Sequence, residues 1–147
     1  IEEGEDQRTF QTGWHFVNRS YNFDSAAGLV YTVDVTKPYG ERVKIASLAG
    51  GDQFCADSTY NVSMTSYRAA GGGNLLSKGA GIDTGNMDDR IVARLDDIRN
   101  ILYDYVQHVG TIKASELRNS AILGQWEFIP SQAIPALRAD MKLLFEK

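Results

Sequence analysis

Three consecutive glycines at positions 71–73 constrain the fold of this chain more than any other feature. Glycine loses more backbone entropy on ordering than any other residue, so such a run ends regular structure. The residues before it, 59–67, alternate between two faces and predict a strand. Glycines after a strand mark a sharp turn, or a place where another group approaches the main chain closely. The glycines alone are equally consistent with a plain flexible loop.

Composition limits the classes of protein to consider. A chain of 147 residues with 43% hydrophobic content is enough for one core and not comfortably enough for two. The net charge is −4 and the basic residues are scattered, which argues against a nucleic acid polymer as partner. No apolar stretch approaches the length that spans a bilayer. The single cysteine, Cys55, excludes an internal disulfide and is best interpreted as a passive thiol.

The start of the chain is acidic and lacks an initiator Met, so we expect a processed product or an excised fragment. We interpret residues 1–19 as a linker or a frayed segment and residues 20–147 as a single, partial domain. Within the first segment, the apolar residues 14–17 fit either a short strand or a contact with another chain.

Strand signals dominate the first half of the chain. Residues 29–35 are β-branched and aromatic, and residues 43–49 return after a turn that contains Pro38 and Gly40. With residues 59–67 as a third strand, the spacing predicts an antiparallel meander. Residues 125–129 alternate and stop at a proline, which predicts an edge strand.

Helical signals come later. Residues 97–109 carry one apolar stripe, and we expect this stripe to pack on the sheet. Asp96 or Asp97 can cap this helix and Gly110 can end it. Residues 134–145 form a second amphipathic pattern. The predicted fold class is therefore α+β, a mostly antiparallel sheet with two amphipathic helices late in the chain.

Self-sufficient catalytic chemistry is missing. The two histidines, His15 and His108, are far apart, and the chain has no Cys/His cluster and no phosphate-binding loop motif. Helix capping explains the paired acids Asp96 and Asp97, so an autonomous carboxylate hydrolase has little support. A polar loop does carry Phe23, whose ring fits either the core or the stacking of a flat heterocycle.

Two motifs point to a known family. Residues 23–43 read FDSAAGLVYTVDVTKPYGERV, and residues 59–75 read TYNVSMTSYRAAGGGNL. Both resemble the C-terminal domain of the 5'-nucleotidase family, which includes UDP-sugar hydrolases and 2',3'-cyclic-nucleotide phosphodiesterases. The helix at 97–109 and the strand at 126–128 follow where the family has a helix and a final strand. The resemblance covers roughly residues 20–130.

The resemblance implies a substrate-binding site for a nucleotide or nucleoside, with the base sandwiched between two aromatic rings. Phe23 matches the first ring, and Leu75 falls at the position of the second. Gly71 and Gly72 match the family's glycine pair. The positions of the family's Asn, Asp and third Gly are taken here by Ser66, Gly73 and Asn74. A one-sided clamp is expected to bind more weakly or to prefer another base.

The resemblance also implies a division of labour. It places no cofactor and no metal on this chain; divalent metal ions are expected on a missing N-terminal metallophosphatase domain or chain. The family's upstream segment, which supplies substrate-binding arginines, is absent from this sequence. Family members are mostly periplasmic, on the cell surface or secreted. The alternative is a degenerate domain that serves as a structural or interaction module.

Overall fold

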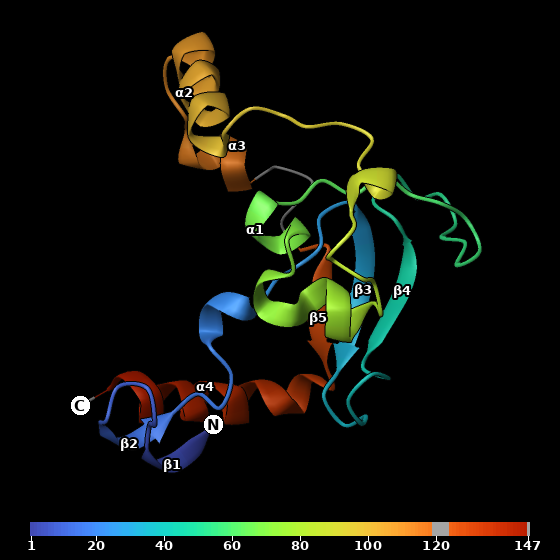
Figure 1. Cartoon of the computed structure of the whole chain (residues 1–147). Helices are drawn as coiled ribbons and strands as arrows, with labels where there is room; N and C mark the ends of the chain where they lie inside the picture. Colours follow the sequence, from blue (N-terminus) through green and yellow to red (C-terminus); the bar gives the residue numbers. More distant parts are fainter. Residues whose placement is uncertain (119–123, 147) are drawn as a thin grey trace. The chain divides into compact units, whose positions relative to one another are not determined.

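The computed structural model of this protein describes residues 1–118 and 124–146, and the chain divides into two compact units. Unit 1 takes Ile1–Cys55 and Ser120–Lys147, and unit 2 takes Ala56–Asn119. Figure 1 follows the chain by colour through both units. Their elements make the protein α+β, as the sequence predicts.

The main sheet of unit 1 has three strands in the order β4-β3-β5 (Figure 1). Strand β3 (Leu29–Asp34) pairs antiparallel with β4 (Val43–Leu48), which confirms the predicted hairpin. Strand β5 (Trp126–Ile129) lies at the edge, as Pro130 after it predicts, but it pairs parallel to β3. Non-local pairing of this kind carries no local signal in the sequence.

The predicted third strand at residues 59–67 is wrong. Residues 59–65 have no strand structure, and helix α1 (Ser66–Ala69) begins where the strand was expected to end. The Thr65 side chain accepts a hydrogen bond from the Arg68 amide, the bond made by a helix N-cap. An alternating pattern forms a strand only where a partner supplies a ladder. A meander would pair residues 59–67 with β4, but β4 pairs only with β3 among the residues that the structure describes.

Residues 1–19, interpreted from sequence as a linker or frayed segment, contain an antiparallel hairpin of β1 (Glu2–Glu5) and β2 (Thr12–His15). Helix α4 (Ile134–Phe145) confirms the second predicted helix, with Pro135 in its first turn. It contacts β2, and the Phe16 and Phe145 rings lie 6.3 Å apart. The hairpin is therefore part of unit 1. Two short turns, η1 (Ser20–Asn22) and η5 (Ser131–Ala133), complete the unit.

Unit 2 is built from short helical turns and one longer helix. Its elements after α1 are η2 (Gly72–Asn74), η3 (Leu75–Gly79), η4 (Asp88–Arg90), α2 (Ile98–Val109) and α3 (Ala114–Arg118). Helix α2 confirms the prediction for residues 97–109: Asp97 caps it by accepting from the Arg99 amide at 2.8 Å, and Gly110 follows at φ 72°. Every residue of α2 is exposed, so its apolar stripe is not buried as expected.

Buried apolar side chains are few in the part of the chain that the structure describes. Tyr31 in unit 1 and Leu76 in unit 2, both 8% exposed, are its buried hydrophobic residues. Tyr31 stacks on Trp126 with ring centroids 5.8 Å apart, so the core of unit 1 lies where β3 meets β5. None of the helices among the described residues has the length and apolar character needed to cross a membrane.

Candidate ligand-binding site

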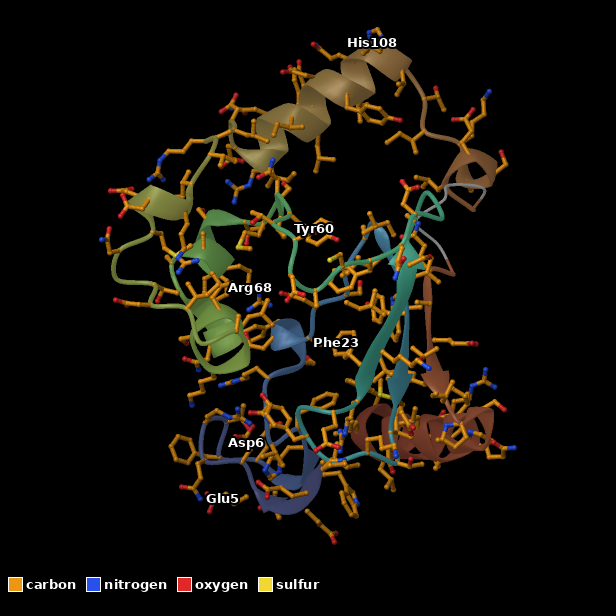
Figure 2. The ribbon with its side chains drawn as sticks, turned by 90° about the vertical axis from the view of Figure 1, so that its right-hand side faces the viewer. Glu5, Asp6, Phe23, Tyr60, Arg68 and His108 are labelled. Atoms are coloured by element: carbon orange, nitrogen blue, oxygen red, sulfur yellow. The ribbon has the colours of Figure 1, made fainter. Side chains whose placement is uncertain are left out.

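Phe23 follows η1 directly, and its amide donates to the Ser20 carbonyl at 3.0 Å. The loop after it is tied to the sheet at two points. The Ala26 amide donates to the Tyr31 hydroxyl at 3.1 Å, and the Gly28 amide donates to Gln125 Oε1 at 3.2 Å. These bonds hold the loop that follows Phe23, which is labelled in Figure 2, against β3 and the residue before β5.

The Phe23 ring belongs to an aromatic cluster but is not buried in it. Its centroid lies 6.0 Å from that of Trp126 at 47°, and Trp126 also contacts Tyr31 and Phe128. Phe23 is nevertheless 63% exposed. Of the two interpretations of this residue, the structure favours an accessible ring supported on one side over a core position. A supported, accessible aromatic face suits stacking with a flat ring.

The glycine loop of unit 2 is a tight, left-handed turn. Gly71 has φ 94° and Gly73 has φ 74°, values that glycine adopts without the cost paid by other residues, and Asn74 has φ 59°. The Gly71 amide donates to the Arg68 carbonyl and the Asn74 amide to the Gly71 carbonyl, both at 3.0 Å. These two amides therefore make hydrogen bonds within the turn and stabilise it.

Two of the glycines are also required by close neighbours in their own unit. A Cβ atom on Gly72 would lie 2.5 Å from the Tyr67 ring, and one on Gly71 would lie 2.7 Å from Thr84 Oγ1. The glycine run predicts that another group lies close to the main chain. Two such groups are side chains of this same chain, Tyr67 and Thr84. The sequence contained no signal that Tyr67 would fold over the loop that follows it.

Arg68 is hydrogen-bonded to the glycine loop. It is buried, its Nη1 donates to the Gly72 carbonyl at 3.1 Å, and its guanidinium lies 5.3 Å from the centre of the Tyr67 ring (Figure 2). A buried guanidinium that donates to a loop carbonyl rigidifies that loop. The sequence alone did not predict that Arg68 is buried beside the loop. The N-cap Thr65 three residues earlier was the signal for the helix that orients it.

The predicted site residues fall in both units. Ser66 opens α1, the three glycines and Asn74 form the turn, and Leu75 begins η3 with 43% of its surface exposed. The structure brings these six residues together in one segment of unit 2. Phe23 lies in unit 1.

The side chains near the candidate site can be compared with those that bind metal ions. Among residues 1–118 and 124–146 no group of three or more His, Cys, Asp or Glu side chains is arranged to hold a metal ion. The side chains of the site are instead an aromatic ring, small residues and hydrogen-bonding groups. Such a set of groups suits the orientation of an organic ligand.

The fold and the site define an α+β module with a rigid glycine turn and an accessible aromatic ring. A family model, the 5'-nucleotidase C-terminal domain, matches residues 3–78, just over half of the chain. The chain belongs to this family. No curated protein and no solved structure matches it significantly.

The family match covers residues 3–78, whereas the resemblance seen in the sequence covers roughly residues 20–130. The matched residues begin within β1, so they include the hairpin that was interpreted as a linker. They end at residue 78, within η3, so the glycine loop is included. Helix α2 and strand β5, which the sequence comparison aligned with the family's later elements, lie outside the matched residues.

Proposed function

We propose that this chain is the nucleotide- or nucleoside-binding specificity portion of a 5'-nucleotidase-like phosphoester hydrolase. The observation that carries the proposal is the family match over residues 3–78, which contains both Phe23 and the glycine loop. In this proposal the base stacks on Phe23, and Ser66 and residues 71–75 supply further contacts to the nucleotide or nucleoside.

The exposure of Phe23 supports the stacking role. An aromatic ring that is 63% exposed and backed by Trp126 loses little conformational entropy when a base covers it. Stacking on one aromatic side chain contributes about 1–3 kcal/mol. Leu75 offers apolar contact but no π face, so the affinity is expected to be lower than for a two-ring clamp.

Catalysis belongs, in this proposal, to an N-terminal metallophosphatase domain or chain that carries divalent metal ions. That domain activates the water, and this chain positions the substrate for in-line attack. The isolated chain should therefore release no phosphate from nucleoside monophosphates or cyclic nucleotides when divalent metal is added. Steady phosphate release by the pure chain would contradict the division of labour. By family, the location is periplasmic, cell-surface or secreted.

The binding claim is tested by titrating adenosine and AMP into the full chain and recording amide shifts by NMR. We expect shifts at Phe23 and at residues 71–75. The Phe23→Ala variant should bind about fivefold to a hundredfold more weakly, the loss of one stacking contact. Tyr39→Ala is the matched control, because Tyr39 is an exposed aromatic residue in the β3–β4 turn of the same unit. Equal affinities of the Phe23→Ala and Tyr39→Ala variants would refute the stacking role.

The second candidate is a degenerate domain that acts as a structural or interaction module. Two observations favour it: Leu75 replaces an aromatic residue, and Tyr67 covers the Gly72 position where a ligand would approach the backbone. This candidate predicts no amide shifts with adenosine or AMP at any position of the loop. The same titration therefore separates the two functions.

A further inference from the structure

A separate hollow lies in unit 1, between the β1–β2 hairpin, η1 and the end of α4. It measures about 250 Å³, and its walls include Arg8, Trp14, Phe16, Arg19 and Phe145. Neither Phe23 nor any residue of the glycine loop lines it. The volume is below the range of about 300–1,000 Å³ that is usual for sites of drug-sized ligands, so its ligand is a small molecule.

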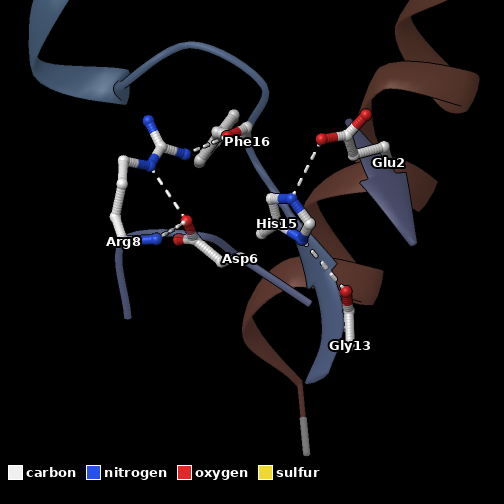
Figure 3. A network of polar contacts seen from close by, with 6 residues as sticks. All are labelled: Glu2, Asp6, Arg8, Gly13, His15 and Phe16. Carbon is white, nitrogen blue, oxygen red and sulfur yellow. Dashed lines mark hydrogen bonds and ion pairs between the residues drawn. The ribbon is translucent and has the colours of Figure 1, made fainter. Parts of the chain in front are cut away.

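The two arginines of the hollow are in different electrostatic states. Arg8 is paired, since its Nε and its amide donate to Asp6 Oδ1 at 2.9 Å and 3.0 Å, and its Nη2 donates to the Phe16 carbonyl at 2.7 Å (Figure 3). Asp6 thus neutralises Arg8. At the end of β2, His15 Nε2 lies 3.1 Å from Glu2 Oε1 of β1, so this histidine also has a carboxylate beside it (Figure 3).

Arg19 has no such partner. It is half-buried in the wall of the hollow, and no side chain or carbonyl among the described residues accepts a hydrogen bond from its guanidinium. A partly desolvated guanidinium is stabilised by an anion that accepts from two of its N–H groups at once. The hollow therefore carries one uncompensated positive charge.

Apolar and aromatic side chains form much of the rest of the wall, beside the polar residues Asp6, His15, Ser20 and Tyr21. The Phe16 and Phe145 rings lie 6.3 Å apart at 54°, and Trp14 is 39% exposed beside them. Aromatic rings around one unpaired cation are complementary to a flat or aliphatic body that ends in one negative charge. We propose that this hollow binds a small organic monoanion, a carboxylate whose head pairs with Arg19 and whose apolar body lies on Trp14 and Phe145.

The probe is phenylacetate, and the readout is the Trp14 indole N–H signal in NMR spectra of the full chain, assigned with Trp14→Phe. We expect saturable shifts at millimolar phenylacetate. Phenylacetamide, which has the same shape without the charge, should bind about tenfold or more weakly, because a charge-assisted pair is lost. Acetate, the head group without the body, should also bind more weakly.

The variant Arg19→Gln should lose affinity for phenylacetate about tenfold or more, and Arg19→Lys should lose less because it keeps the charge. Arg99→Gln removes an exposed arginine of unit 2 and is the matched control, with no expected effect. Equal binding of acid and amide by the unaltered chain would overturn the proposal, whether or not the variants fold. So would the absence of any Trp14 shift, or equal affinity of Arg19→Gln and Arg99→Gln. Adenosine binding at Phe23 is independent of these outcomes.

Discussion

Adding one methyl group at Gly72 tests the internal packing of the glycine loop. A Cβ atom there would meet three atoms of the Tyr67 ring at 2.5–2.6 Å, well inside van der Waals contact. The φ of Gly72 is not in the left-handed region, so an alanine is acceptable to the backbone and only the ring opposes it. The substitution Gly72→Ala therefore isolates one steric contact.

The loss of stability caused by Gly72→Ala depends on how far the Tyr67 ring can move away from the added methyl group. Overpacking usually costs about 1–3 kcal/mol. Tyr67 is 54% exposed, so its ring can swing outward, at the cost of its contact with Arg68, worth about 0.5–1 kcal/mol at such sites. Alanine also lowers the conformational entropy of the unfolded chain, which stabilises the folded state by about 0.4–1 kcal/mol. We expect a net loss of about 1 kcal/mol of local stability, roughly a fivefold change in the local opening equilibrium.

Native-state hydrogen exchange is the suitable assay, because it reports on the opening of individual amides in the loop. The Asn74 and Ile82 amides, which donate to the Gly71 and Leu76 carbonyls, should exchange about fivefold faster in Gly72→Ala. Gly79→Ala is the matched control, since a Cβ atom on Gly79 has no neighbour within 4 Å.

A double-mutant cycle completes the test. In a Tyr67→Ala background the clash is absent, so adding Gly72→Ala should cost nothing or stabilise slightly. Two results would refute the reasoning. One is equal exchange rates in Gly72→Ala and Gly79→Ala, and the other is an undiminished cost of Gly72→Ala when the Tyr67 ring is gone.

Two further predictions concern single carboxylates. Hydrogen bonds from the Arg8 side chain and amide lower the pKa of Asp6 from 3.8 to about 2. The Asp6 carboxylate therefore stabilises the β1–β2 hairpin fully above about pH 4, and this stabilisation is lost as the pH falls toward 2. The Thr9 and Phe10 amide shifts should follow this transition, and Asp6→Asn should abolish it. Asp97→Ala should cost α2 about 0.5–2 kcal/mol and lower its helicity by circular dichroism, while Asp97→Ser should retain most of it.

Local patterns were enough for several elements of this fold. The β3–β4 hairpin follows from β-branched residues on both sides of a Pro- and Gly-containing turn, and α2 follows from its stripe with Asp97 before it and Gly110 after it. The family also follows from sequence, because the motif around the glycine loop is contiguous. Each of these signals is carried by neighbouring residues, so a single chain can display it.

Contacts between distant residues decided the rest. The parallel pairing of β5 with β3 joins residues almost a hundred positions apart. The expected third strand at residues 59–67 finds no such partner and does not form. The hollow at Arg19 exists only because the C-terminal end of α4 lies against β2.

The same division holds for the glycine loop. Its sequence determined that the chain turns at residues 71–73, because only glycine tolerates such backbone angles at little cost. Which groups approach that turn was decided by the tertiary structure, which places the Tyr67 ring over Gly72 and the Arg68 guanidinium on its carbonyl. Backbone conformation is a property of the residue itself, whereas a neighbour in space depends on how the remaining chain packs.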